Sequence, residues 1–238
     1  MTYLRPLAAL GVALLAGCGL ISSDVTNFDL TLPDKNFTID ASSWQVDQTQ
    51  ASQLLMMSCS SNSLCDTAAQ QACSSGCSGE CVTSSGMSSC VLHLEFSAFQ
   101  AVNLLMEKPE LKQINDEPVI KVTIDSVTYE VTSNTLNVET PRMNVSVAPM
   151  SVMDPTDPMA KLIGTIDGIA PDTTTNGPQT MTYTDTGKAD LVAIMSTYKT
   201  PFNIIVGSMP PGYTVSRSTP FPMGKLDAVV HIKAHAGI

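Results

Sequence analysis

Apolar and polar residues alternate along most of the chain, which is typical of β-strands that are buried on one face. The clearest case is residues 119–131, where apolar side chains occupy even positions as far as Ile124 and odd positions from Val127. Because successive side chains of a strand point to opposite faces, this change of phase predicts a β-bulge near Asp125 and Ser126.

Similar alternation, broken by Pro, Gly, Asn and Asp, predicts further short strands at residues 28–32, 37–39, 92–96, 136–138, 143–147, 162–169, 179–184, 202–206 and 226–235. Residues 103–116 are expected to form an irregular or briefly helical connector, and 209–224 a Pro/Gly loop. Apolar positions 191, 194, 195 and 198 have helical spacing instead, with an N-cap at Asp185 or Thr186 and a stop before Pro201. The pattern therefore predicts a mainly β fold, an antiparallel β-sandwich with one short helix.

Residues 48–90 have a different composition, rich in Ser, Gly, Gln and Cys and poor in large apolar side chains. Such a segment buries too little surface to order itself, so we expect it to depend on covalent cross-links. The only helix predicted in it is one turn near residues 66–72. The segment is interpreted as a disulfide-rich insertion, at about residues 50–90, into a single β-sandwich domain of residues 18–238.

Six cysteines lie within this insertion: Cys59, Cys65, Cys73, Cys77, Cys81 and Cys90. In an oxidising compartment, an even number of closely spaced cysteines predicts three disulfides, whose connectivity remains open among 15 pairings. The alternative is a metal site on Cys73-x3-Cys77-x3-Cys81, a spacing that zinc sites also use. Disulfides are favoured, because no histidine lies between Cys59 and Cys90.

The first residues of the chain have the features of an export signal. Arg5 precedes an apolar run, PLAALGVALLAG, which is shorter than the roughly 20 residues that cross a bilayer. The run ends in Leu15-Ala16-Gly17-Cys18, which resembles the lipobox of bacterial lipoproteins. This resemblance implies that residues 1–17 are a signal peptide and that Cys18 is lipidated. The alternative is an ordinary secretory signal followed by a chance cysteine.

The lipoprotein resemblance also implies which membrane holds the chain. Gly19 follows the lipidated cysteine, and the absence of Asp at that position favours the outer membrane. Because the first predicted strand begins at Phe28, the folded part of the chain is expected to lie close to the bilayer.

The charge balance limits the possible partners. Residues 1–17 contain one of the 12 Lys and Arg residues and none of the 22 acidic residues, so the mature chain has a net charge of −11. Nucleic acids and anionic lipid surfaces are bound by basic patches, so neither is expected as a partner. The membrane contact is expected to come from lipid on Cys18.

The second half of the chain is similar to uncharacterised envelope lipoproteins in VTIDSVTYEVTSNTLNV, DPMAKLIGTI, YKTPFNIIVG and PFPMGKLDAVVHI. The order of strand, Asn-containing turn (Asn134, Asn137), Gly164, short helix and two final strands also resembles the LEA type 2 (WHy-like) family. That family resemblance implies a β-sandwich without catalytic residues.

Two short motifs resemble catalytic sites. Ser196 and Lys199 have the S-x-x-K spacing of penicillin-binding enzymes, but the K-T-G partner motif is missing. Asp185-Thr186-Gly187 matches the tripeptide of aspartic proteases, which need two such loops. We therefore interpret the first motif as a helix end and the second as a helix cap.

Two other groups have side chains that bind metals. His231 and His235 are expected on the polar face of a strand with Lys233 between them, an arrangement that disfavours a metal. Methionines 150, 153 and 159, near Asp154 and Asp157, could bind Cu(I), although methionine more often fills core gaps.

The sequence thus predicts no catalytic residues, no metal site and no cofactor. The expected function is that of a non-catalytic, membrane-anchored lipoprotein that acts as a binding or structural module of the envelope. The alternative is a carrier that binds lipid or another apolar ligand between its two sheets.

Overall fold

The computed structural model describes the backbone of residues 27–114 and 120–237 and the side chains of residues 29–112 and 120–237. The expected signal peptide, residues 1–17, and Cys18 lie outside this range. The described chain forms three antiparallel sheets. The first sheet contains β1 (Asn27–Asp29), β2 (Lys35–Asp40), β6 (Lys121–Asn134), β9 (Gln179–Thr180) and β13 (Lys225–Gly237). The second contains β5 (Ser97–Val102), β7 (Met143–Pro149), β8 (Lys161–Ile166), β10 (Thr182–Tyr183) and β11 (Phe202–Ser208). The third contains β3 (Cys77–Ser84), β4 (Met87–Leu94) and β12 (Tyr213–Val215). The predicted mainly β, antiparallel class is confirmed.

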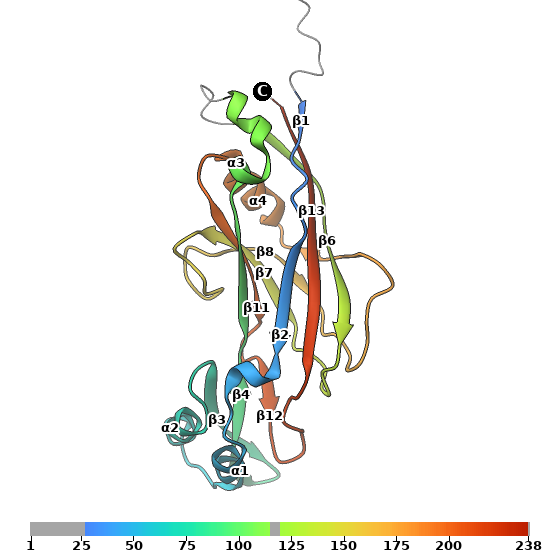
Figure 1. Cartoon of the computed structure of the whole chain (residues 1–238). Helices are drawn as coiled ribbons and strands as arrows, with labels where there is room; N and C mark the ends of the chain where they lie inside the picture. The colour runs from blue at the N-terminus through green and yellow to red at the C-terminus, as the bar shows by residue number, and fades with distance from the viewer. Residues whose placement is uncertain (1–26, 115–119, 238) are drawn as a thin grey trace, which may run out of the picture.

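Strand β13 pairs with three of the other four strands of the first sheet. Along one edge it pairs with β1 and β2, and along the other with β6 (Figure 1). Lys233 pairs with Ser126 and Ala234 pairs with Ile124, so Asp125 is the extra residue of a bulge. The bulge predicted from the change of phase is confirmed at that position. Because of this bulge, the apolar side chains of β6 before and after Asp125 all face the core.

The first two sheets face each other across an apolar core. Strand β11 lies between β7 and β5 in the second sheet, and all seven of its residues are buried. Helix α4 (Gly187–Ser196) packs on this core through Leu191 and Met195, and its N-cap is Thr186, one of the two predicted residues. The apolar core runs without a break from these sheets into the residues around the disulfides.

The end of the molecule that contains β1 is fastened by two ion pairs. Helix α3 (Leu104–Glu107) and the 3-10 helix η3 (Pro109–Ile114) form the briefly helical connector predicted there. The Lys35 ammonium lies 2.7 Å from Glu107 in a largely buried setting, and Lys108 lies 3.8 Å from Asp29. These contacts hold α3 beside the first sheet, near the C-terminus (Figure 1).

Asp227 fastens the opposite end of the first sheet. The Thr38 hydroxyl of β2 donates a 2.7 Å hydrogen bond to Asp227 of β13, and this bond lowers the pKa of the Asp227 carboxyl. The hydroxyl and N–H of Ser42 lower the pKa of Asp40 in the same way. The ionised form of each carboxylate is therefore the one that accepts these hydrogen bonds in the folded chain.

Several local predictions were wrong. The helical turn expected near residues 66–72 is present but belongs to a longer helix, α2 (Asn62–Ala72). Helix α1 (Gln48–Met56) and the 3-10 helix η2 (Ala41–Trp44) were not predicted, so α4 is not the only helix of the described residues. Leu136 and Val138 are buried, but residues 136–138 form no strand. Strand β5 was not predicted, and β12 lies inside the expected Pro/Gly loop. The longest helix of the described residues has 11 residues, and none has the length and apolar character to cross a bilayer.

Candidate functional site

Helices α1 and α2 and the hairpin β3–β4 form a unit that we call the disulfide module. Its three disulfides join Cys59 to Cys81, Cys65 to Cys90 and Cys73 to Cys77. The prediction that all six cysteines form disulfides is confirmed, and the structure supplies the connectivity. The metal alternative on Cys73, Cys77 and Cys81 loses its ligands, because all three thiols are in disulfides.

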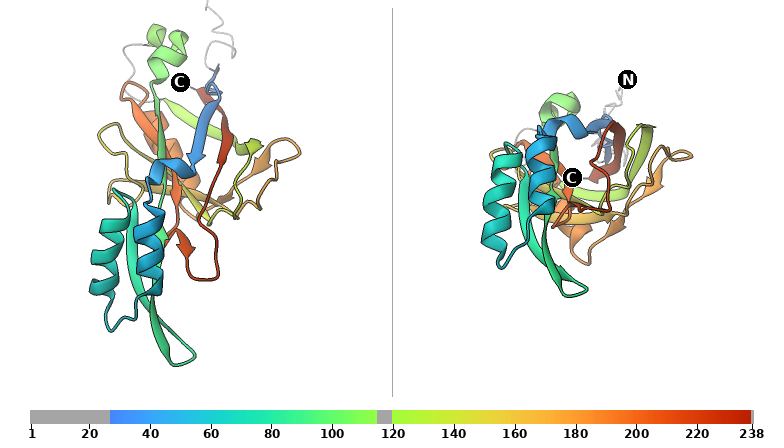
Figure 2. Two further views of the ribbon diagram at one scale, coloured as in Figure 1. Left: turned by 60° about the horizontal axis from the view of Figure 1, so that its bottom comes forward. Right: turned by 90° about the horizontal axis from the view of Figure 1, so that it is seen from below.

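The disulfide module lies at the end of the molecule opposite to β1 (Figure 1). Asn27 pairs with Gly237 at the end of β13, whereas Asp40 pairs with Lys225 at its start. The 13 residues of β13 therefore separate the two ends, and at about 3.3 Å per residue they span about 40 Å. Beyond Asp40 the chain continues through η2 into α1. Figure 2 shows α1 and α2 side by side on one face of the β3–β4 hairpin.

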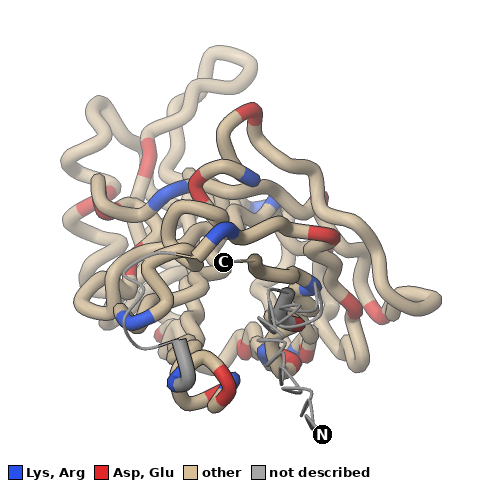
Figure 3. Tube along the Cα trace, turned by 90° about the horizontal axis from the view of Figure 1, so that it is seen from above, with Lys and Arg blue, Asp and Glu red and all other residues tan. Residues whose placement is uncertain are grey.

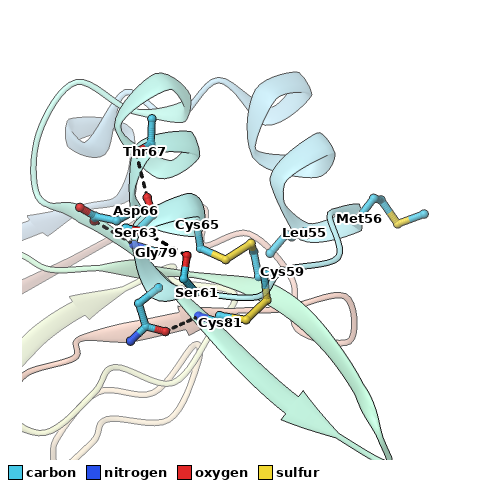
Figure 4. The surroundings of a disulfide bond; sticks show 12 residues. Leu55, Met56, Cys59, Ser61, Ser63, Cys65, Asp66, Thr67, Gly79 and Cys81 are labelled. Atoms are coloured by element: carbon cyan, nitrogen blue, oxygen red, sulfur yellow. Dashed lines mark hydrogen bonds between the residues drawn. A yellow bond between two sulfur atoms is a disulfide. The ribbon is translucent and has the colours of Figure 1, made fainter.

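Helix α2 packs against β3 at backbone distance. Gly79 of β3 lies under the peptide of Cys65 and Asp66, where a Cβ atom would be 2.8 Å from the Asp66 nitrogen. Two α2 side chains accept hydrogen bonds from β3 amides: Asp66 from Gly79 (3.3 Å) and Asn62 from Cys81 (3.0 Å). The α2 side chains therefore cover the outer edge of β3 (Figure 4).

Two of the disulfides pack against each other inside this contact. The sulfur atoms of Cys59, Cys65 and Cys81 all lie within 4.8 Å of one another, and Cys81 pairs directly with Cys90 across the hairpin. Cys65 and Cys90 are at most 1% exposed, so this bond belongs to the core. The Cys59–Cys81 disulfide is partly exposed.

A buried histidine ties the three strands of the third sheet together. His93 of β4 is 5% exposed. Its Nδ1 lies 3.0 Å from the Thr214 hydroxyl of β12, and its Nε2 lies 3.0 Å from a Glu80 carboxylate oxygen of β3. A hydroxyl, an imidazole and a carboxylate are thus in contact, but their hydrogen bonds fasten β12 and β3 to β4. No motif in the sequence indicates this group, because Thr214 lies 121 positions from His93 along the chain.

Arg217, in the loop after β12, closes the C-terminal end of α1. Its Nε donates to the Leu55 carbonyl at 2.7 Å, and its Nη2 donates to the Met56 carbonyl at 3.1 Å. Carbonyls at a helix C-terminus lack intrahelical partners and attract cations, so this contact stabilises α1. The Met56 side chain is 70% exposed and points away from the disulfides (Figure 4).

A hollow of about 420 Å³ lies beside Arg217. It is lined by Ser58, Cys59, Ser84, Ser85, Met87, Ser88, Ser89 and Arg217. Two further clefts, of about 460 and 410 Å³, flank η2 where the module joins the sandwich. Trp44 forms part of both walls, and its indole N–H donates to the Glu95 carbonyl at 2.7 Å.

The space between the two large sheets is much smaller. An apolar cavity of about 20 Å³ lies there, lined among others by Phe37, Phe96, Tyr129 and Val206. Small-molecule sites usually measure about 300–1,000 Å³. A lipid would fit only after the sheets moved apart.

The two motifs that resemble catalytic sites lie at the ends of α4. Ser196 is the last residue of the helix, and Lys199 lies beyond it, with its ammonium 5.6 Å from the centre of the Tyr198 ring. Asp185-Thr186-Gly187 forms the start of the same helix. Both motifs therefore have the structural positions that the sequence analysis assigned to them.

The histidine and methionine candidates lie on the sandwich. His231 Nδ1 contacts Asp34 at 2.6 Å, and His235 contacts Asp125 at 3.1 Å, so each imidazole has its own carboxylate. The three methionines of the β7–β8 loop, Met150, Met153 and Met159, are each about half exposed. Asp154 and Asp157 accept hydrogen bonds from the amides of Thr156 and Met159, which shape this loop.

No protein-family model matches the chain, and comparisons with curated proteins and with solved structures found no significant similarity to any of them.

Proposed function

We propose that this chain is a non-catalytic lipoprotein that is anchored to the outer membrane through Cys18 and acts as an envelope binding or structural module. The disulfide module is the part that contacts the partner. One observation supports this assignment above the others: the disulfide module and the first strand lie at opposite ends of the molecule (Figure 1).

The distance between anchor and module follows from the chain. Eight residues separate Cys18 from Asn27, where β1 begins, and a chain of that length spans at most about 30 Å. The β1 end therefore stays near the bilayer, and β13 places the module about 40 Å farther away. A lipoprotein of this shape presents the disulfide module to components beyond the reach of the lipid.

The first experiment tests the anchor. The full precursor is expressed with labelled palmitate in a bacterium that processes lipoproteins, and the membranes are then fractionated. The native chain is expected to carry label and to sediment with the outer membrane. Cys18→Ser is expected to lose the label, whereas the matched variant Cys73→Ala/Cys77→Ala should keep it. A native chain that is secreted without label would contradict the proposal.

The second experiment tests which end binds. A photoreactive residue replaces Met87 in the disulfide module, which is 72% exposed, or Met159 in the sandwich, which is 51% exposed. Irradiation of intact cells is expected to cross-link position 87, and not position 159, to one envelope component. Equal cross-linking from both positions, or cross-linking from position 159 alone, would exclude the module as the binding end.

The carrier alternative has weaker support, because the cavity between the sheets measures only about 20 Å³. Native mass spectrometry of the mature chain, produced from residue 19, distinguishes the two functions. A retained apolar ligand would favour the carrier, and a bare mass would favour the binding module.

A further inference from the structure

The hollow beside Arg217 combines one cation with a wall of hydroxyl groups. Residues 36–107 contain no Lys or Arg, so the disulfide module has no strong cation of its own. Arg217 reaches it from the β12–β13 loop, a segment distant in sequence. Elsewhere along the described trace, Lys and Arg positions are scattered among acidic ones (Figure 3).

Arg217 differs from the other arginine of the described residues in its partners. Arg142 forms an ion pair of 2.7 Å with Asp167. Arg217 contacts only the carbonyls of Leu55 and Met56, and no carboxylate of the described residues lies within ion-pair distance of it. Its positive charge is therefore not neutralised by a neighbouring side chain.

The hydrogen bonds of Arg217 also leave it oriented for a ligand. A guanidinium has five N–H donors, and two of them, on Nε and Nη2, are held by the α1 carbonyls. Three donors remain, on Nη1 and Nη2, and one from each nitrogen can form a fork. Such a fork binds the two oxygens of a carboxylate or phosphate. Because the guanidinium is already held in place, little further side-chain entropy is lost on binding.

Other residues that line the hollow supply hydroxyls. Ser58, Ser84, Ser85 and Ser89 line the same hollow, and the hydroxyls of these four form no hydrogen bond with any described residue. Met87 adds an apolar edge and is 72% exposed. At about 420 Å³ the hollow is large enough for a small organic ligand rather than for a single ion.

We propose that this hollow binds an acidic sugar, with its carboxylate or phosphate on Arg217 and its ring hydroxyls on the serines. The inference rests on the proposed function, because it names the ligand class of the same disulfide module. It gives Arg217 a second role besides closing α1.

The test measures binding to the mature chain, produced from residue 19, by calorimetry and by amide chemical shifts. The probes are glucuronate, glucose as its neutral counterpart, and inorganic phosphate. Glucuronate is expected to bind at least about tenfold more tightly than glucose, because only the acid uses the Arg217 fork. Phosphate is expected to bind more weakly than glucuronate, because it makes no contact with the serine wall.

Variants separate binding from stability. Arg217→Lys retains the charge but loses the fork, and it is expected to weaken glucuronate binding about tenfold. Arg142→Lys, the matched control, should leave binding unchanged. Ser58→Ala/Ser89→Ala does not touch the α1 carbonyls, so it should weaken glucuronate binding while the thermal unfolding midpoint stays the same.

Three outcomes would overturn the inference: no glucuronate binding, equal binding of glucuronate and glucose, or equal binding by the native chain and Arg217→Lys. None of these outcomes affects the palmitate or cross-linking results. The acidic-sugar site and the lipoprotein proposal are therefore tested independently of each other.

Discussion

Gly79→Ala is expected to lower the free energy of unfolding by about 3 kcal/mol or more. The new methyl group would meet the Cys65 carbonyl and the Asp66 nitrogen, which are backbone atoms of α2. A side chain could rotate away from it, but this backbone is held by the Cys65–Cys90 disulfide. Helix α2 would therefore have to leave β3, and two hydrogen bonds from β3 amides would be lost. Urea unfolding followed by circular dichroism measures the change.

Gly86→Ala is the matched control in the same hairpin. Gly86 has a φ of +78°, and nothing lies within 4 Å of its added Cβ. This variant has backbone strain without a clash, so its expected cost is about 1–2 kcal/mol. If Gly79→Ala cost no more than Gly86→Ala, the close packing of α2 on β3 would not contribute as described.

The second large effect is expected when the buried disulfide is removed. Cys65→Ala/Cys90→Ala opens a loop with a sequence separation of 25, for which the chain-entropy model gives about 3.5 kcal/mol. Lost packing adds to this value, because both residues are at most 1% exposed. Urea unfolding at neutral pH measures the difference from the native chain.

The other two disulfides serve as controls for this effect. Cys73→Ala/Cys77→Ala opens a separation of only 4, for which the same model gives about 2 kcal/mol. Cys59→Ala/Cys81→Ala opens a separation of 22 in partly exposed surroundings, so it should rank between them. A buried pair that cost less than Cys73–Cys77 would contradict its place in the core.

The sequence predicted the long strands well, because every second residue of a strand with one buried face is apolar. In β6 the pattern even located the bulge, since one extra residue at Asp125 reverses the phase of all residues after it. The helical spacing and cap of α4 were visible for the same reason.

Helix α1 was not predicted, and of α2 only the turn near residues 66–72 was. Helix α2 turns Cys65, Ala69 and Ala72 toward the core, and these residues contribute little to an apolar pattern. One signal was present: Asp47 caps α1 by accepting hydrogen bonds from Thr49 and Gln50. Disulfide connectivity could not be predicted, because it depends on how α2 lies across the hairpin.

The candidate site was less predictable than the fold. The sequence identified the Cys-rich segment as a distinct, disulfide-rich insertion, but nothing in it assigned Arg217 to that segment. The pairing of β12 with β4 brings residue 217 to the end of α1, across 161 positions of sequence. A long-range contact of this kind leaves no periodic trace along the chain.

The cover that α2 provides for β3 has a consequence for solubility. An uncovered edge strand offers unpaired amides to other chains and promotes association. Asn62 and Asp66 occupy these amides as long as α2 stays in place, and the disulfides hold it there. Reduction of the disulfides would therefore allow α2 to leave β3, and the unpaired amides of this edge strand would become accessible to other chains. We therefore expect the reduced chain to aggregate more readily than the disulfide-bonded chain.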